Sequence, residues 1–186
     1  MGLDFREFKD KDAKAVVNLF NTCFQAYRTL EEWKWMYLKM PGFDTSSILV
    51  CEDENTGELV GSVLTVQANA LVKGRKHVVG MINDVDTLPH WRGNGIATKL
   101  MKMAIDDGKK KSYSALFLYA NPFGEAAGIY RRIGFRDAQY FSYNGRMSGS
   151  RAAAKSFPFP MNLIGPVAAA ASGINSRRYR LPKKFF

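Results

Sequence analysis

The sequence predicts an α/β fold (α+β in its strand arrangement), with a mixed, mostly antiparallel sheet flanked by helices. Short apolar and alternating runs interleave with helical periodicity in the order β-α-α-β-β-β-α-β-α-β. Two long strand-like runs, 59–72 and 77–88, are separated only by the turn Lys73-Gly74-Arg75, which predicts an antiparallel hairpin. The strand, helix and strand that follow predict a parallel pair. At 186 residues, the chain has the length of one folded domain.

The first third of the chain predicts one strand and two helices. Residues 4–8 alternate as a short strand, and Asp10 or Asp12 is placed to begin a helix. Thr29 followed by Glu32 is a capping box that predicts a second helix, ended by Pro41-Gly42. The apolar positions of the two helices are Val16, Val17, Leu19, Phe20, Cys23 and Phe24 in the first and Trp33, Met36, Tyr37 and Met40 in the second.

One further strand is predicted before the hairpin, and the other elements come after the hairpin. Residues 48–52 predict that strand, and 55–57 a turn. A helix begins after Arg92-Gly93-Asn94-Gly95 and is expected to end at Gly108. Beyond it we expect a strand at 115–120 buried on both faces, a helix at 125–133 stopped by Gly134, and a last strand at 136–147.

The charge is concentrated at one end of the chain. The net charge is +10, yet eight of the 27 basic residues and none of the 17 acidic residues follow Asp137. We therefore predict a folded domain at 1–149 and a basic, Pro/Ala-rich extension at 150–186. The extension could contact RNA, an anionic membrane or phosphates, but a solvated tail is the simpler interpretation, and we expect no nucleic-acid partner.

Other classes of protein fit the sequence poorly. No apolar run reaches the roughly 20 residues of a membrane span, and the charged start does not resemble a signal peptide, so we expect a cytoplasmic protein with no transmembrane segment. Cys23 and Cys51 lack metal or redox spacing, and two histidines alone do not make a zinc site. We therefore expect no metal.

The turn at residues 92–98 is the richest chemical feature of the sequence. Gly93 and Gly95 lack a Cβ, so a ligand can approach the backbone closely, and the unpaired first amides of the following helix suit a pyrophosphate. Arg92 and Lys99 could add positive charge. An ordinary strand-to-helix turn remains the alternative. A P-loop and a dinucleotide fingerprint both fail, because the required Gly-Lys and third glycine are absent.

Two motifs in the chain resemble those of one enzyme superfamily. Arg92-Gly93-Asn94-Gly95-Ile96-Ala97 resembles the Arg/Gln-x-x-Gly-x-Gly/Ala signature of the GNAT acyl-CoA-dependent acyltransferases. The stretch Ala126-x-x-x-Tyr130 to Gly134-Phe135 resembles the second motif, A-x-x-x-Y-x-x-x-G-F. There is a weaker resemblance to the enhanced-intracellular-survival branch. The resemblance implies a GNAT-like fold over about residues 3–147 and acetyl-CoA as co-substrate.

The resemblance also implies roles for individual residues. The amides of Val85 and Thr87 should bind the pantetheine arm, and Tyr130 should protonate the leaving thiolate. Asn121 could contact the cofactor arm, although the family asparagine falls at the position of Phe123. The pyrophosphate should be held by the backbone amides of Gly93, Asn94, Gly95, Ile96, Ala97 and Thr98, and Arg92 is the remaining predicted cofactor-binding residue.

The sequence alone does not identify the general base. Asp84 and Asp86 are candidates on the strand that precedes the turn, with Glu125 and a water relay as alternatives. Strand alternation would put both aspartates on one face. The predicted function is N-acetyl transfer from acetyl-CoA to a small-molecule or peptide amine by direct ternary-complex transfer, in a chain that could form a homodimer. The alternatives are a non-catalytic acyl-CoA sensor and a nucleic-acid-associated protein that uses the basic tail.

Overall fold

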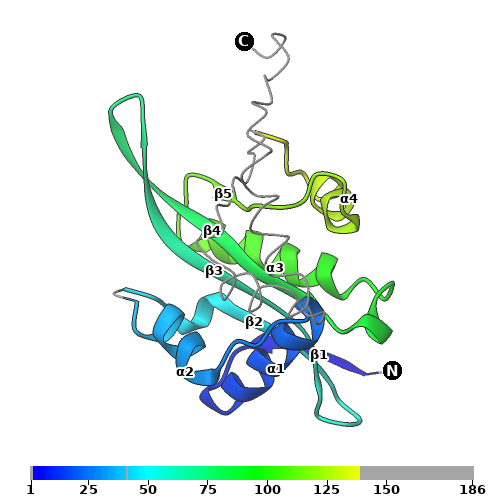
Figure 1. Ribbon diagram of the computed structural model, residues 1–186. Helices are drawn as coiled ribbons and strands as arrows, with labels where there is room; N and C mark the ends of the chain where they lie inside the picture. Colours follow the sequence, from blue (N-terminus) through cyan, green and yellow to red (C-terminus); the bar gives the residue numbers. More distant parts are fainter. Residues whose placement is uncertain (1, 41, 139–186) are drawn as a thin grey trace, which may run out of the picture. The chain divides into compact units, whose positions relative to one another are not determined.

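A computed structural model describes residues 2–40 and 42–138, and it confirms the predicted fold class. All of its helices and strands lie in the first of two compact units, residues 1–136. They follow the predicted order as far as the fourth helix (Figure 1). The elements are β1 (Leu3–Glu7), α1 (Ala13–Phe24), α2 (Leu30–Trp33), β2 (Ile48–Asp53), β3 (Leu59–Val72), β4 (Arg75–Thr87), α3 (Ile96–Lys110), β5 (Leu116–Phe117) and α4 (Glu125–Arg132).

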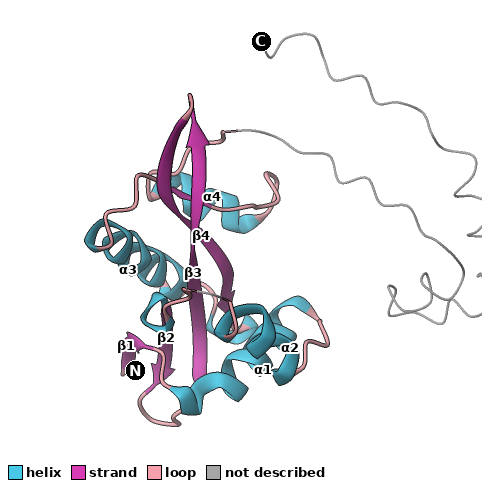
Figure 2. Cartoon of the chain, turned by 90° about the vertical axis from the view of Figure 1, so that its left-hand side faces the viewer, coloured by secondary structure: helices cyan, strands magenta, loops and turns pink. Residues whose placement is uncertain are grey.

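The described strands form one sheet in the order β1-β2-β3-β4-β5. The first three neighbouring pairs are antiparallel, whereas β4 and β5 are parallel, as the intervening α3 requires. Helices cover both faces of this sheet, with α3 on one side and α1 with α2 on the other (Figure 2). Parallel pairing involves only Gly80 with Leu116 and Met81 with Phe117. Beyond Met81, β4 therefore continues to Thr87 without β5 beside it.

The face covered by α1 and α2 has an aromatic core. Trp33 is completely buried and packs against Phe8 and Tyr37, with ring centroids 5.7 and 5.8 Å apart. The predicted capping box begins α2: the Glu32 amide donates to Thr29 Oγ1, and the Thr29 amide donates to the Glu32 carboxylate. The chain then widens into a π-helix, η2 (Lys34–Leu38). Such segments are rare and often mark functional sites.

The other face is packed against α3 through a close approach at Gly61. Ile96, Leu100 and Met101 of α3 are fully buried against the sheet. A Cβ placed on Gly61 would lie 2.6 Å from Ile96 Cγ2 and 3.2 Å from the Asp86 carbonyl oxygen. Glycine at this position thus lets the start of α3, which carries the predicted phosphate turn, lie directly on β3.

Replacing Gly61 with alanine should therefore destabilise the protein. The added methyl group would overlap the Ile96 side chain and crowd the Asp86 carbonyl oxygen, and such overpacking costs about 1–3 kcal/mol. Urea unfolding of Gly61→Ala should show this loss. Gly128→Ala is the matched control, because its Cβ would meet only the end of Arg132 at 3.5 Å. An unchanged unfolding midpoint in Gly61→Ala would contradict this close packing of α3 on β3.

The structure corrects two predicted boundaries and leaves a third open. Helix α3 does not end at Gly108 but continues to Lys110, because Gly108 is a contact point at which Leu116 carbons lie 3.1 Å from where a Cβ would stand. The strand predicted at 115–120 is only two residues long, and both are partly exposed. Residues 136–138 are not a strand, and the rest of the predicted last strand, like the extension 150–186, lies outside the described residues.

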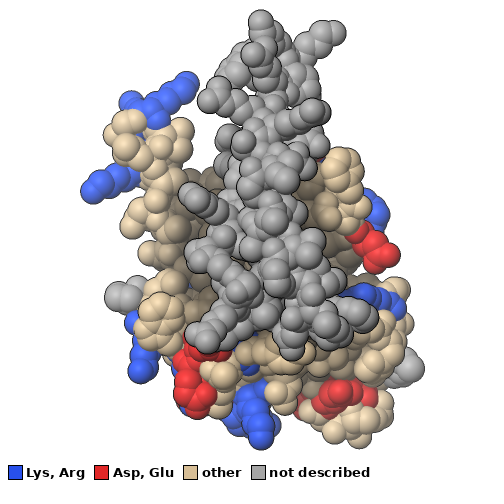
Figure 3. All heavy atoms as spheres, in the orientation of Figure 1, with Lys and Arg blue, Asp and Glu red and all other residues tan. Residues whose placement is uncertain are grey.

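The β3–β4 hairpin extends beyond the rest of the sheet. Its outer part, from Asn69 paired with Val78 to the turn at Lys73-Gly74, pairs with no other described strand, although the Ser114 amide donates to the Val78 carbonyl at 2.8 Å (Figure 1). Lys73, Arg75 and Lys76 gather at its tip, in the upper left of Figure 3. Among the described residues, no helix is long and apolar enough to cross a membrane.

Candidate active site

A β-bulge in β4 shapes the site. Ser62 of β3 faces Asp86, but Leu64 faces Asn83, so Asp84 and Val85 together oppose one residue. Asp84 has a φ of 44°, which is unusual for a residue other than glycine. Bulges bend a strand and redirect its side chains. The simple alternation expected for this part of β4 therefore does not apply.

A cavity of about 490 Å³ opens beside the end of β4, where β5 no longer accompanies it. Four separate segments line it: the end of α1, the end of β4, the turn and first residues of α3, and α4. Nine of the predicted site residues lie in its wall, namely Val85, Thr87, Arg92, Gly93, Gly95, Ile96, Ala97, Thr98 and Tyr130.

The glycine turn gives this cavity an anion-binding wall. Gly93 and Gly95 have φ values of 84° and 76°, which residues with a Cβ rarely adopt. Gly95 is the N-cap of α3 and has no side chain to satisfy the first amides, and the first α-helical bond runs from the Lys99 amide to the Gly95 carbonyl. As far as the described residues are concerned, the amides of the first helical turn are therefore available to an anionic ligand.

The charges near this wall differ in part from those expected. Arg92 lines the cavity, and its Nε donates to the Thr87 carbonyl at 3.4 Å. Arg132 lines it from α4. Lys99 does not line the cavity, because its ammonium lies 3.8 Å from the centroid of the Phe5 ring. The expectation that Lys99 adds charge to the ligand site is not met.

Asp86 is a buried carboxylate close to the cavity. Its side chain is 1% exposed; Ser62 Oγ donates to Oδ2 at 3.2 Å, and Oδ1 has no hydrogen-bond partner among the described residues. Burial raises the pKa of Asp86 to about 7, and the negative charge of Asp84 adds to the rise. A carboxyl group with this pKa exchanges its proton near neutral pH, as a general base must.

Tyr130 lies in the cavity wall on α4. Its ring makes an edge contact with Phe135, with centroids 6.2 Å apart. Burial raises the pKa of the Tyr130 phenol, and the charge of Asp86 raises it further. The phenol therefore keeps its proton at neutral pH and is able to donate it.

The other predicted residues lie outside the cavity wall. Asp84 is bonded to Arg28 and Tyr37 instead. Asn94 Nδ2 donates to the Trp91 carbonyl at 3.0 Å, which closes the turn on itself. Asn121 Oδ1 accepts from the Phe123 amide at 3.0 Å within its own loop. Glu125, the alternative base, does line the cavity.

Six lining residues were not predicted. The most notable is Cys23 on α1: burial raises the pKa of its thiol, the charge of Asp86 adds to the rise, and contacts with the Thr87 backbone and Arg92 oppose it. The first helix carried an apolar pattern that predicted only packing. The complete set of unpredicted lining residues is Cys23, Phe24, Trp91, Ala126, Ile129 and Arg132.

Comparison with known proteins agrees with this architecture. The model of the acetyltransferase (GNAT) domain family matches residues 4–138. An uncharacterized N-acetyltransferase of Methanocaldococcus jannaschii is 27% identical over 125 residues, which are 62% of this chain and 54% of the relative. The chain thus spans about half the length of the curated relative that it matches.

Solved structures show the same fold. A Trypanosoma brucei acetyltransferase superposes with a TM-score of 0.63 and 20% identity, covering 78% of this chain and 100% of that one. A predicted acetyltransferase from Clostridium acetobutylicum, crystallised with acetyl-CoA, gives 0.60 and 18%, covering 77% and 96%. The family match extends over most of the chain and includes the glycine turn and the tyrosine helix. This chain belongs to the GNAT acetyltransferase family.

Proposed function

We propose that the protein transfers an acetyl group from acetyl-CoA to an amine of a small molecule or peptide. The observation that carries this proposal is one cavity that joins the free amides of α3 to Tyr130, with Asp86 close beside it. The cavity fits the co-substrate: the turn supplies anion-binding amides and the end of β4 supplies Val85 and Thr87 for the pantetheine arm. Acetyl-CoA would supply the acetyl group as a thioester.

Two side chains divide the proton transfers in this proposal. Asp86 takes a proton from the acceptor amine, because its unpartnered Oδ1 can accept one and its pKa of about 7 suits neutral pH. Since Asp86 does not line the cavity, that proton reaches it through a bridging water. Tyr130 donates its phenolic proton to the departing sulfur. Asp84 transfers no proton in this proposal, because one of its carboxylate oxygens already accepts hydrogen bonds from Arg28 and Tyr37.

Binding of acetyl-CoA is the first test. A Gly95→Trp substitution should abolish micromolar binding in calorimetry, because the indole would occupy the space in front of the α3 amides. Gly74→Trp is the matched control: Gly74 has a φ of 77°, close to the 76° of Gly95, and open space around it, but it lies at the hairpin tip.

The pair of variants separates the outcomes. Loss of binding in Gly95→Trp alone would support the co-substrate site, and an acceptor screen with a panel of amines would follow. Equal binding by both variants would place acetyl-CoA elsewhere and contradict the proposal. Binding without transfer to any amine would favour the alternative function, a non-catalytic acyl-CoA sensor.

A further inference from the structure

Three stretches of unusual backbone meet at one carboxylate, that of Asp84. Asp84 itself is in the left-handed region, at a φ of 44°. The link that follows α1 begins with Gln25 at a φ of 51° and brings in Arg28. The π-helix η2 brings in Tyr37. Conformations of this kind cost free energy and persist where the surrounding structure holds them in place.

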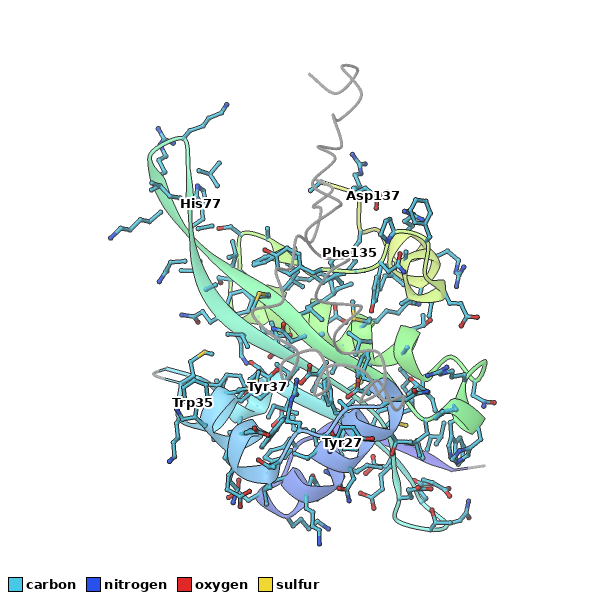
Figure 4. The ribbon with its side chains drawn as sticks, viewed as in Figure 1. Tyr27, Trp35, Tyr37, His77, Phe135 and Asp137 are labelled. Carbon is cyan, nitrogen blue, oxygen red and sulfur yellow. The ribbon has the colours of Figure 1, made fainter. Side chains whose placement is uncertain are left out.

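The contacts on Asp84 are close and directed at one oxygen. Arg28 Nη1 donates to Asp84 Oδ2 at 2.6 Å, and the Tyr37 hydroxyl donates to the same atom at 2.9 Å. The side chains of Arg28 and Asp84 are only 14% and 12% exposed, so solvent screens the pair weakly. Figure 4 shows Tyr37 reaching from the η2 segment toward the sheet, whereas Trp35 of the same segment points outward.

Arg28 is itself held from two directions. The Asn21 side chain accepts from the Arg28 amide and donates to the Arg28 carbonyl, each at 2.8 Å. The guanidinium carbon lies 3.5 Å from the centroid of the Phe20 ring. A guanidinium stacked on an aromatic ring with its main chain clamped is a fixed charge, unlike a mobile surface arginine.

This fixed ion pair adjoins the proposed reaction centre. Asp84 shares the bulge with Val85, and Asp86 follows one residue later. The charge of Asp84 raises the pKa of Asp86, whereas the charge of Arg28 lowers it. The other polar groups facing Asp86 are Ser62 from β3, Cys23 from α1 and Tyr130 from α4.

We propose that Arg28 is a positioning residue: through its ion pair with Asp84 it holds the β4 bulge and sets the protonation state of Asp86. The catalytic consequence rests on the proposed function, in which Asp86 is the base. The effect of the ion pair on the titration of the Asp86 carboxyl group does not rest on the proposed function, because it can be measured without any acetyl transfer.

The pH profile of acetyl transfer tests the catalytic part. In Arg28→Gln the acid limb of the kcat/KM profile should move to a pH about one unit higher. On the acidic side kcat/KM should be about tenfold lower than in wild type, and at higher pH it should equal the wild-type value. In Asp84→Asn the limb should move down. The double variant Arg28→Gln/Asp84→Asn should return close to wild type. A fall in kcat with an unshifted profile in both single variants would mean a merely structural role and would overturn the proposal.

Carboxyl titration tests the pair without relying on activity. Carbon-13 resonances of the aspartate carboxyl groups, with Asp86 assigned by its absence in Asp86→Asn, should report a higher pKa in Arg28→Gln and a lower one in Asp84→Asn. The exposed pair Lys109 and Asp106 supplies the matched controls Lys109→Gln and Asp106→Asn, which should leave the pKa of Asp86 unchanged.

The two measurements separate two kinds of failure. If the wild type transfers no acetyl group but the Asp86 titration moves as expected, the proposed function fails and the ion-pair proposal stands. If the Asp86 titration coincides in wild type, Arg28→Gln and Asp84→Asn, the ion-pair proposal is overturned, whatever the enzyme does.

Discussion

Replacing Asp86 with asparagine is expected to lower kcat/KM for acetyl transfer by about 10²–10⁴-fold. This is the usual range for the loss of a positioned general base. Asparagine keeps the size of the side chain and the capacity to accept from Ser62 Oγ, but it cannot take a proton. The residual rate should rise with pH, because free amine then becomes more abundant in solution.

The same substitution should stabilise the protein above neutral pH. The folded state raises the pKa of Asp86 from 3.8 to about 7, so it favours the protonated form. Asp86 therefore lowers the stability of the wild type as the pH rises from about 4 to about 7, and this contribution is absent from Asp86→Asn. This increase in the pKa of Asp86 corresponds to a loss of about 4 kcal/mol of unfolding free energy, reached at a pH at which Asp86 is ionised in both the folded and the unfolded state.

Denaturant unfolding at pH 4.0 and pH 8.0, set alongside steady-state rates, checks both effects. The free-energy difference between Asp86→Asn and wild type should be small at the lower pH and large at the higher one. Asp106→Asn, on the exposed face of α3, should change neither quantity. An Asp86→Asn enzyme that is as active as wild type would remove Asp86 from the mechanism, even if its stability changes as expected.

Replacing Tyr130 with phenylalanine should lower kcat by about 10²-fold or more while leaving acetyl-CoA affinity nearly unchanged. The ring would keep its edge contact with Phe135, so the wall of the cavity stays in place. What disappears is a proton donor whose pKa burial has raised above its ordinary 10. The loss should therefore affect the chemical step and spare binding.

Calorimetry and single-turnover rates on Tyr130→Phe separate those two quantities. Tyr113→Phe is a suitable comparison, because burial also raises the pKa of Tyr113 but the residue does not line the cavity. A Tyr130→Phe enzyme with an unchanged single-turnover rate would show that the sulfur obtains its proton from another source.

The geometry of the glycine turn was predictable because its signal is local. Gly93 and Gly95 stand before a helical pattern, and the positive φ values found there are what two glycines in such a turn permit. The helix that carries Tyr130 and its end at Gly134 were predictable for a similar reason, since the helix and its stop signal together span only ten residues, 125–134. In each case one continuous segment carries the whole feature.

The rest of the site depends on contacts that no single segment encodes. Cys23 and Phe24 reach the cavity from α1, yet locally they continue an apolar helix face. The bulge that separates the surroundings of Asp84 from those of Asp86 arises from the register of β4 against β3, which alternation alone does not reveal. The ion pair with Arg28 joins residues 56 positions apart.

The extended β3–β4 hairpin makes the fold convenient to label. Within residues 2–40 and 42–138, no atom lies within 4 Å of the Cβ position at Gly74, and both flanking residues are exposed. Exposed tips of this kind tolerate insertions because no buried backbone has to move. A short peptide epitope or a fluorophore attached at Lys73-Gly74 would sit away from the cavity beside the end of β4, whose lining includes neither residue, and would report on the folded protein without altering the candidate site.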